Sequence, residues 1–164
     1  MLFRSDGVIA SAHEPIQLNY LTERLISDEV PTAVYLVRHG ETPLTPFRKF
    51  SGDGPLNPAL TEKGLKEAHL VAEEVAKLQP DVLFSSPLQR TRQTADIVAK
   101  ATGLPVLVDP IWIECSFGVW DGMSIDEVRD AYPVEYAKWL STTSYAPPEG
   151  ESYESAMEIG RAHV

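Results

Sequence analysis

The hydrophobic positions of this chain form short apolar runs, separated by longer segments in which apolar residues recur every three or four positions. A short apolar run between turn residues is typical of a buried strand, whereas the wider spacing is typical of an amphipathic helix. The apolar runs predict strands over residues 33–37, 82–84 and 106–108. We expect residues 33–37 to form a buried strand of a parallel sheet.

Helix-capping residues mark the ends of the segments between the predicted strands. Thr61 can cap a helix that runs to about residue 78. The Ser-Pro-Leu-Gln stretch predicts another helix start with Ser86 as its cap, and Gly103 ends that helix. The face of the first helix that packs on the sheet is expected to contain Leu65, Ala68, Ala72 and Val75. Further short helices are predicted over residues 124–132 and 134–140 and after Ser152.

Strands that alternate with helices indicate βαβ units and a parallel sheet. The expected fold class is therefore α/β, a three-layer α/β/α domain with a mainly parallel central sheet. Residues 6–31 are weakly patterned and are interpreted as a linker. The Pro- and Gly-rich residues 43–58 and 145–150 are interpreted as loops.

The composition is that of one ordinary globular domain, with 164 residues of which 43% are hydrophobic and 23% charged. The formal net charge is -10 and the charges are scattered, which argues against a nucleic-acid-binding surface and against an anionic membrane partner. A phosphate site in so acidic a chain must be locally basic. The single Cys115 excludes an internal disulfide, and no apolar run approaches the roughly 20 residues of a membrane span. Because no signal-peptide or lipidation pattern is present, the cytoplasm is the expected location.

The two ends of the chain read as non-native sequence. Written as codons, residues 1–5 and 159–164 both correspond to parts of a widely used DNA-sequencing adapter. We interpret these residues as adapter-derived, residues 6–31 as a linker and residues 32–158 as one domain. On this interpretation the domain is C-terminally truncated, and the natural chain continues beyond residue 158.

Reactive side chains follow the predicted strands, at the sheet edge where an open α/β sheet places its ligand site. Arg38 and His39 come directly after the first strand, and Arg90 lies in the first turn of the helix after the second. Glu114 follows the third strand. Guanidinium groups match phosphate oxygens, an imidazole can attack phosphorus, and a carboxyl that burial keeps protonated can donate to a leaving oxygen. Backbone amides at residues 86–89 can add to this anion site. Each feature alone is also typical of an ordinary surface, but their ordered recurrence favours phosphoryl transfer.

Five motifs of the chain resemble the histidine phosphatase superfamily, which contains the cofactor-dependent phosphoglycerate mutases and many acid phosphatases. The motifs are LVRHGET at 36–42, RKFSG at 48–52, LTEKG at 60–64, SSPLQRTRQTA at 85–95 and IECSFGVWDGMS at 113–124. Together they are far more specific than any one of them. The resemblance runs from about residue 33 to the last native residue, and it implies a phosphoglycerate mutase-like fold.

The resemblance also implies a role for individual residues. His39, in the RHG motif, is expected to accept the phosphoryl group, which Arg38 and Arg90 hold. Glu114 is expected to be the proton donor. The phosphate pocket is expected to include Ser51 and Gly52. The resemblance implies a reaction that needs no metal ion or other cofactor.

A second histidine of this family, in an HG motif after a late strand, completes the phosphate pocket. No such motif is present in this chain. His13 lies in the predicted linker, and His69 lies within a predicted helix. His163 is not followed by glycine and belongs to the residues interpreted as adapter-derived. The missing histidine is therefore expected downstream of residue 158.

Three positions differ from the pattern of the mutases. Thr45 stands where they have Asn, Phe117 where they have Tyr, and Ile125 where they have the Lys that binds the substrate carboxylate. Their insertion with paired arginines is also absent. These differences favour hydrolysis, although Thr45 and Phe117 are still expected to contact the substrate. The stretch FGVWDGMS resembles α-ribazole phosphatases, and RHGETPL and PPEGES resemble the acid phosphatase domain of bifunctional ribonuclease H/acid phosphatase proteins.

The sequence therefore predicts hydrolysis of a phosphomonoester, a small phosphorylated metabolite, by an acid phosphatase or α-ribazole phosphatase type of enzyme. A phosphoglycerate mutase and a non-catalytic phosphate-binding module are the alternatives. A ribonuclease H domain at the N-terminal side of the full-length chain is a further hypothesis, although this domain is not expected to bind nucleic acid or a membrane directly. The fragment itself is expected to be inactive, because one catalytic histidine is missing.

Overall fold

The computed structural model of the chain describes residues 2–4 and 32–161. Its strands are β1 (Leu2–Arg4), β2 (Ala33–Tyr35), β3 (Val82–Ser85) and β4 (Val106–Val108). Its α-helices are α2 (Glu62–Lys77), α3 (Gln89–Thr102), α4 (Ile125–Ala131), α5 (Pro133–Ser141) and α6 (Tyr153–Arg161). Short 3-10 helices are η1 (Thr45–Phe47), η2 (Pro110–Trp112) and η3 (Gly118–Trp120). The predicted linker over residues 6–31 lies outside the described residues.

The four described strands form one sheet in the order β2-β1-β3-β4. β3 and β4 are parallel, and β1 is antiparallel to both of its neighbours, so β2, β3 and β4 run in the same direction. The predicted α/β class with a mainly parallel sheet is confirmed. The prediction that residues 33–37 pair as a parallel strand is wrong, because their neighbour β1 runs antiparallel to β2. β1 consists of residues interpreted as adapter-derived, and that interpretation stays a prediction.

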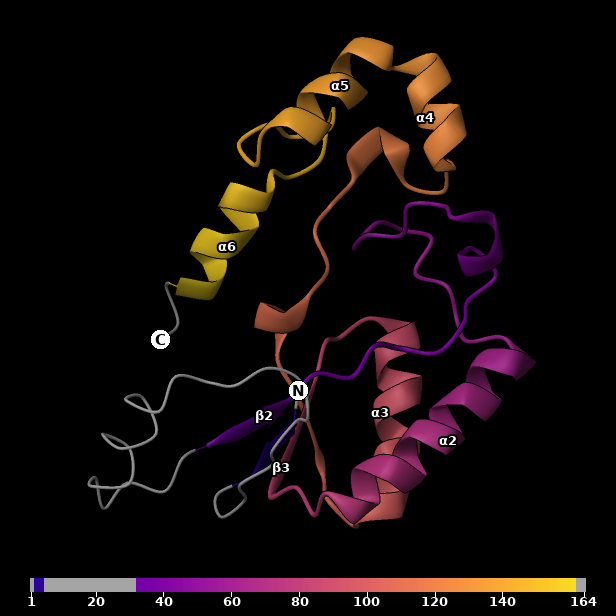
Figure 1. The fold of residues 1–164 in the computed structure, drawn as a ribbon, viewed down its shortest axis with the longest axis vertical. Helices are drawn as coiled ribbons and strands as arrows, with labels where there is room; N and C mark the ends of the chain where they lie inside the picture. Colours follow the sequence, from indigo (N-terminus) through magenta and orange to yellow (C-terminus); the bar gives the residue numbers. More distant parts are fainter. Residues whose placement is uncertain (1, 5–31, 162–164) are drawn as a thin grey trace, which may run out of the picture.

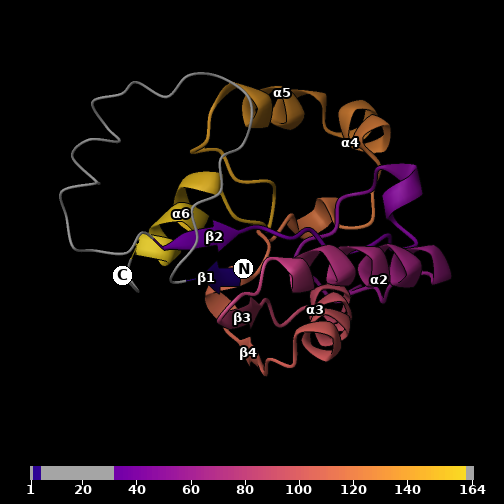
Figure 2. The same ribbon diagram turned by 60° about the horizontal axis from the view of Figure 1, so that its bottom comes forward.

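Helices α2 and α3 pack against each other and cover one face of the sheet (Figures 1 and 2). The core of this layer contains Leu60, Ala68, Ala72, Val75, Leu83, Ile97 and Val98. Thr61 caps α2 as predicted, since its hydroxyl oxygen accepts the N–H of Gly64 at 3.0 Å. The predicted buried face is wrong at Leu65, which is 37% exposed, because Gly64 takes the buried position at the start of the helix.

The opposite face of the sheet carries exposed apolar side chains in the described part of the chain. Val34 and Leu107 are each 45% exposed, and Leu36 is 80% exposed. Successive side chains of a strand point to opposite faces, and of residues 33–37 only Tyr35 and Val37 pack against the core. The prediction of a buried strand at 33–37 is therefore wrong for the alternate positions, Val34 and Leu36.

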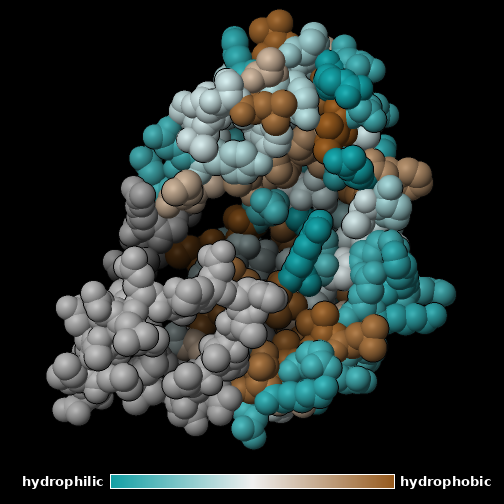
Figure 3. All heavy atoms as spheres, in the orientation of Figure 1, coloured by the Kyte–Doolittle hydropathy of each residue, from teal (hydrophilic) through white to brown (hydrophobic). Residues whose placement is uncertain are grey.

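Elements η3 and α4 to α6 surround a cluster of aromatic rings. Fully buried Trp120 lies at its centre, with ring centroids 5.8 to 6.4 Å from those of Phe50, Tyr132, Tyr136 and Trp139. Phe50 ties the 43–58 loop to this cluster, since its N–H donates to the carbonyl of Met123 at 2.8 Å and its carbonyl accepts from Gly122 at 2.9 Å. Figure 3 shows the surface hollowed between this group of elements and the α2–α3 layer.

Local signals predicted several helix ends correctly. Ser124 caps α4 in a capping box with Glu127, and Gly103 ends α3 in a left-handed conformation with φ of 75°. The predicted cap at Ser86 is wrong, because Leu88 has an extended backbone with ψ of 144° and α3 begins only after it. None of the described helices is long and apolar enough to cross a bilayer.

Candidate active site

His39 lies beyond the carboxyl end of β2, and a hydrogen bond fixes the orientation of its ring. Nδ1 lies 2.7 Å from the carbonyl oxygen of Gly40, which can only accept, so Nδ1 carries the hydrogen and donates it. Nε2 is therefore left with its lone pair. A neutral imidazole with a free Nε2 is the form that can attack phosphorus.

The surroundings of His39 favour this neutral form. Partial burial lowers the pKa of His39 below its ordinary value of 6.5, and the positive charges of Arg90 and Arg38 lower it further. The hydrogen bond to Gly40 and the charge of Glu114 oppose these effects without overcoming them. The lowered pKa thus favours the neutral imidazole over the protonated form.

Gly40 lets the loop after His39 lie directly against both helices. A Cβ atom at Gly40 would overlap the carbonyl oxygen of Gly64 in the first turn of α2. The N–H of Gly40 donates to the hydroxyl oxygen of Thr94 on α3 at 3.3 Å. The backbone next to His39 is therefore fixed by α2 on one side and by α3 on the other.

Arg90, in the first turn of α3, is a buried cation with unused donors. Its Nη2 donates to the carbonyl oxygens of Ser51 at 2.9 Å and Gly52 at 3.2 Å, and the residue is 2% exposed. Its Nε and Nη1 atoms are buried with no hydrogen-bond partner among the described residues. Burial lowers the pKa of Arg90, and the charges of Glu114 and Asp121 oppose this effect. An arginine guanidinium keeps its charge in proteins. Such donors match the oxygens of a phosphate group.

Ser51 and Gly52 differ in what they can offer to a ligand. The hydroxyl of Ser51 is buried without a partner in the described part of the chain, so it is available to an anion. The N–H of Gly52 is already donated to Asp121 Oδ1 at 2.7 Å. A Cβ atom at Gly52 would overlap the carbonyl oxygen of Cys115, which brings the 113–117 segment close to this loop.

One cavity of about 660 Å³ brings most of the predicted site residues together. The predicted residues on its wall are Arg38, His39, Thr45, Ser51, Glu114 and Phe117. Arg90 is bonded to the carbonyl of Ser51, and Gly52 follows Ser51 in the chain. The volume lies within the range of about 300–1,000 Å³ that is typical of small-molecule sites.

Glu114 reaches the cavity but is not buried. Its side chain is exposed, and Oε1 accepts the N–H of the adjacent Cys115 at 3.0 Å. The sequence interpretation required burial to keep this carboxyl protonated. That expectation is wrong for the described residues, because no segment within 32–161 covers the side chain.

The cavity wall also contains residues that were not predicted to contact the substrate. Thr42 is 1% exposed, and its N–H donates to the hydroxyl oxygen of Thr45 at 3.0 Å. Arg48 and Lys49 add two cations, and Ile125 adds an apolar surface. Arg48 and Lys49 belong to the RKFSG motif, but an irregular loop gives no periodicity from which inward-facing side chains could be predicted.

The anion site expected at the backbone amides of residues 86–89 is largely occupied within the protein. The N–H of Gln89 donates to Asn57 Oδ1 at 2.8 Å. The N–H of Leu88 lies 3.4 Å from the hydroxyl oxygen of Ser86, which accepts it. The expectation is therefore wrong for Leu88 and Gln89, because loop and turn side chains satisfy both amides.

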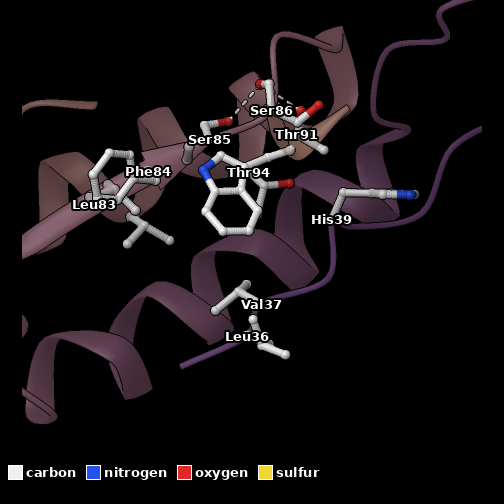
Figure 4. A pocket seen from close by; sticks show the side chains of 12 residues that line it. Leu36, Val37, His39, Leu83, Phe84, Ser85, Ser86, Thr91 and Thr94 are labelled. Carbon is white, nitrogen blue, oxygen red and sulfur yellow. Dashed lines mark hydrogen bonds between the residues drawn. The ribbon is translucent and has the colours of Figure 1, made fainter. Parts of the chain in front are cut away.

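A second cavity, of about 210 Å³, also borders His39 (Figure 4). It is lined mainly by apolar side chains from the end of β2, from β3 and from α3. The carbonyl of Ser86 in its wall accepts hydrogen bonds from the hydroxyls of Ser85 and Thr91. This lining does not suit a phosphate group, because it offers no cation.

His69, the other histidine that the structure describes, lines neither cavity. His69 is exposed on α2. His13 and His163 lie outside the described residues. Within residues 2–4 and 32–161, no group of three or more His, Cys, Asp or Glu side chains could hold a metal ion.

Comparison with known proteins gives the family of this chain. The sequence profile of the histidine phosphatase superfamily, branch 1, matches residues 34–162. The chain belongs to the histidine phosphatase superfamily. The resemblance inferred from the RHG motif and its companions is thereby confirmed.

Several curated members of the superfamily are similar to the chain. Bifunctional protein Rv2228c of Mycobacterium tuberculosis is 38% identical over 128 residues, covering 77% of this chain and 35% of that protein. Phosphoserine phosphatase 1 of Hydrogenobacter thermophilus is 40% identical over 105 residues, covering 64% and 49%. Probable phosphoglycerate mutase GpmB of Yersinia pestis is 40% identical over 129 residues, covering 78% and 58%. The chain thus spans between 35% and 58% of the lengths of these histidine phosphatases.

Solved structures of the superfamily confirm the phosphoglycerate mutase-like fold. Mycobacterial glucosyl-3-phosphoglycerate phosphatase Rv2419c, in complex with VO3, is 31% identical with a TM-score of 0.71. The alpha-ribazole phosphatase of Shigella flexneri is 25% identical with a TM-score of 0.68. Each match covers 77% of this chain and 62% of the other, so the described fold corresponds to a part of the complete domain.

Proposed function

We propose that the natural protein containing this chain is a phosphomonoesterase that transfers a phosphoryl group to His39 and then to water. The observation that carries the proposal is the pairing of a neutral His39, with Nε2 free, and a buried Arg90 with unused donors. Arg90 is close enough for its charge to lower the pKa of His39, and its Nη2 holds the carbonyl of Ser51, a residue on the wall of the cavity that His39 lines. A fixed nucleophile beside preorganised anion donors is the arrangement that phosphoryl transfer needs.

In the first step, Nε2 of His39 attacks phosphorus and an N–P bond forms while the ester P–O bond breaks. The leaving oxygen keeps the electron pair of that bond and takes a proton from Glu114. In the second step, water attacks phosphorus, gives a proton to the Glu114 carboxylate and displaces His39. Inorganic phosphate leaves, and both groups return to their starting states. Arg38 and Arg90 offset the negative charge on the phosphoryl oxygens in both steps.

Hydrolysis is favoured over isomerisation by the wall of the cavity. Ile125, at the position where mutases have a carboxylate-binding lysine, lies on that wall as an apolar residue. Similar proteins named as phosphoserine, glucosyl-3-phosphoglycerate and alpha-ribazole phosphatases also support a phosphatase. The proposed substrate is a small phosphorylated metabolite, and the acid phosphatase and α-ribazole phosphatase types both fit.

A phosphoglycerate mutase is the second candidate, because the GpmB protein is 40% identical over 129 residues. The two activities differ in the final phosphoryl acceptor. Incubation of the complete domain with 3-phosphoglycerate distinguishes them, since a phosphatase releases inorganic phosphate and a mutase forms the 2-isomer. A non-catalytic phosphate-binding module would do neither.

The proposed activity belongs to a chain longer than residues 1–164. The second histidine of the family pocket is expected downstream of residue 158, and the exposure of Glu114 fits a site that lacks a covering segment. We therefore expect little turnover from this fragment, and fast turnover by it would contradict the proposal. A cytoplasmic location and an upstream ribonuclease H domain are also proposed, and the genomic sequence before residue 6 tests the latter.

The test of the proposed function is the replacement His39→Ala in the complete natural chain. We expect hydrolysis of p-nitrophenyl phosphate to fall by about 10⁴-fold or more, because the attacking atom is removed. His69→Ala is the matched control, since His69 is exposed on α2 away from both cavities. Full activity of the His39→Ala variant would overturn the mechanism.

A further inference from the structure

We infer that the cavity of His39 contains a second anion site, formed by Arg48 and Lys49, which selects phosphomonoesters that carry a carboxylate or a second phosphate. The inference rests on the proposed function and names the substrate class of the same site. Both side chains line the cavity that also contains Arg38, His39 and Glu114.

The cavity has more positive charge than one phosphate group requires. Its wall contains three cations, Arg38, Arg48 and Lys49, and the carboxylate of Glu114, although the chain as a whole has a net charge of -10. Arg38 together with the buried Arg90 already matches the oxygens of the reacting phosphate. Arg48 and Lys49 remain for another anionic group, and the cavity of about 660 Å³ has room for the carbon skeleton that would join the two anions.

The charges of Arg48 and Lys49 are only weakly neutralised by the protein. Within the described residues no carboxylate lies within ion-pair distance of Arg48. Lys49 Nζ lies 4.0 Å from Oε2 of Glu127, at the limit of an ion pair. That oxygen already accepts the N–H of Ser124 at 2.6 Å as part of the capping box. Among the described residues, Arg48 is therefore free to bind an anion in the cavity, and Lys49 has only this weak contact with Glu127 to give up.

The backbone beneath the two cations is held firmly. Arg48 has a left-handed conformation, with φ of 51°, that a residue with a Cβ seldom adopts. Its N–H donates to Thr45 at 3.1 Å, and the N–H of Lys49 donates to Leu44 at 3.2 Å. The next residue, Phe50, is bonded on both sides to the 122–123 turn. The strained loop is thus kept in place by its neighbours, as is typical of a segment that presents side chains to a ligand.

The two cations also account for an apparent gap in the site. Ile125 leaves no cation at the start of α4, but Arg48 and Lys49 reach the same cavity from the loop before Phe50. A second anion of the substrate would therefore be bound from the 45–50 loop and not from α4. The substrate class that fits is a phosphomonoester with another oxyanion on the same small skeleton.

Calorimetric titration with matched ligands tests this inference on residues 1–164 and on the complete chain. Glycerol 3-phosphate and 3-phosphoglycerate differ in one carboxylate, and propyl phosphate and propane-1,3-diol bisphosphate differ in one phosphate. We expect the ligand with two anionic groups to bind about tenfold more tightly in at least one pair. The pair that shows the preference identifies the second anion as a carboxylate or a phosphate.

In the double variant Arg48→Gln with Lys49→Gln, the two ligands of each pair should bind with about equal affinity. The charge-matched control, Lys66→Gln with Lys100→Gln, removes two exposed cations from α2 and α3 and should keep the preference. The double variant Arg48→Lys with Lys49→Arg retains both charges and should also retain the preference for the ligand with two anionic groups. Thermal unfolding shows that each variant is folded. Equal binding within both pairs in the unsubstituted protein, or an unchanged preference in the Gln double variant, would overturn the inference.

Assays of p-nitrophenyl phosphate hydrolysis separate this inference from the proposed function. Hydrolysis by the complete chain without any ligand preference would reject the second anion site and leave the phosphatase standing. A preference carried by Arg48 and Lys49 without hydrolysis would reject the phosphatase and support the site.

Discussion

The two sides of the cavity around His39 differ in how far their side chains are buried and hydrogen-bonded. On the α3 side, Arg90 is 2% exposed, bonded to two carbonyls and close to His39, whose neighbour Gly40 lies against both α2 and α3. On the other side, Glu114 is exposed and bonded only to the amide of the next residue among the contacts of the described chain. The arginine side of the cavity is thus buried and hydrogen-bonded in this chain, and the Glu114 side is not.

This difference separates binding from turnover. A preformed guanidinium and a neutral imidazole can bind phosphate without further change, because their surroundings already fix them. A carboxyl group that acts as a proton donor must be shielded from water, and an exposed side chain has little such shielding. The fragment is therefore expected to bind phosphate and vanadate well before it catalyses anything.

The largest effect is expected when the buried side is damaged. Arg90→Met removes the charge and leaves the carbonyls of Ser51 and Gly52 without their donor, so vanadate affinity should fall about a hundredfold and stability by about 3 kcal/mol. Titration calorimetry and urea unfolding measure these changes. Arg38→Met, at an exposed position, should lower affinity but change stability by less than about 0.5 kcal/mol. Equal loss of stability in Arg90→Met and Arg38→Met would contradict the contrast between the buried and the exposed arginine.

The next effect concerns the exposed side in the complete chain. Glu114→Gln cannot donate a proton, so hydrolysis of an alkyl phosphate should fall about a hundredfold. The fall should be much smaller for p-nitrophenyl phosphate, whose leaving group needs less protonation. Steady-state kcat/KM for both substrates provides the measurement. The same loss for both leaving groups would show that Glu114 is not the proton donor.

A smaller effect is expected for the loop that supports the nucleophile. Gly40→Ala forces a Cβ against the backbone of Gly64 and should cost about 3 kcal/mol of unfolding free energy. Gly103→Ala meets no atom within 4 Å and suffers only from its positive φ, so about 1 kcal/mol is expected. Urea unfolding of both variants gives the comparison. A neutral Gly40→Ala substitution would mean that the loop does not lie against α2 as described.

The smallest effect is a pKa change, which NMR titration of the imidazole carbons can follow. The pKa of His39 should lie below its ordinary value of 6.5, and Arg38→Met should raise it, because a repelling charge is removed. The direction of the His39 pKa shift also determines how stability depends on pH. As the pH falls through 6.5 the unfolded chain gains a proton that folded His39 does not, so stability declines until the lowered pKa is passed. A pKa of His39 above 6.5 would contradict the buried, neutral nucleophile.

The parts of the fold that were predicted correctly depend on local signals. β3, β4, α2 and α4 follow from short apolar runs, helical spacing and the caps Thr61 and Ser124, which need no information from distant residues. The start of α3 was missed because the extended backbone of Leu88 outweighs a good cap signal at Ser86. The exposure of Leu36 was missed because its burial depends on what covers the second face of the sheet.

In the candidate site, too, residues marked by local signals were predicted and residues positioned by distant contacts were missed. His39, Arg38 and Arg90 could be selected because they follow strands at the ligand-binding edge and belong to specific motifs. Arg48 and Lys49 could not, since they belong to an irregular loop that Phe50 bonds to the distant residues Gly122 and Met123. Sequence patterns do not encode such long-range contacts of a loop.

The most direct test of the central claim is to trap the phosphoenzyme. The complete chain, mixed with p-nitrophenyl phosphate and quenched in alkali, should give an acid-labile phosphoryl group on the peptide that contains His39, detected by mass spectrometry. The His39→Ala variant should give none, and the His69→Ala control should give the normal amount. Steady turnover with the phosphoryl group on another residue, or on none, would contradict the account.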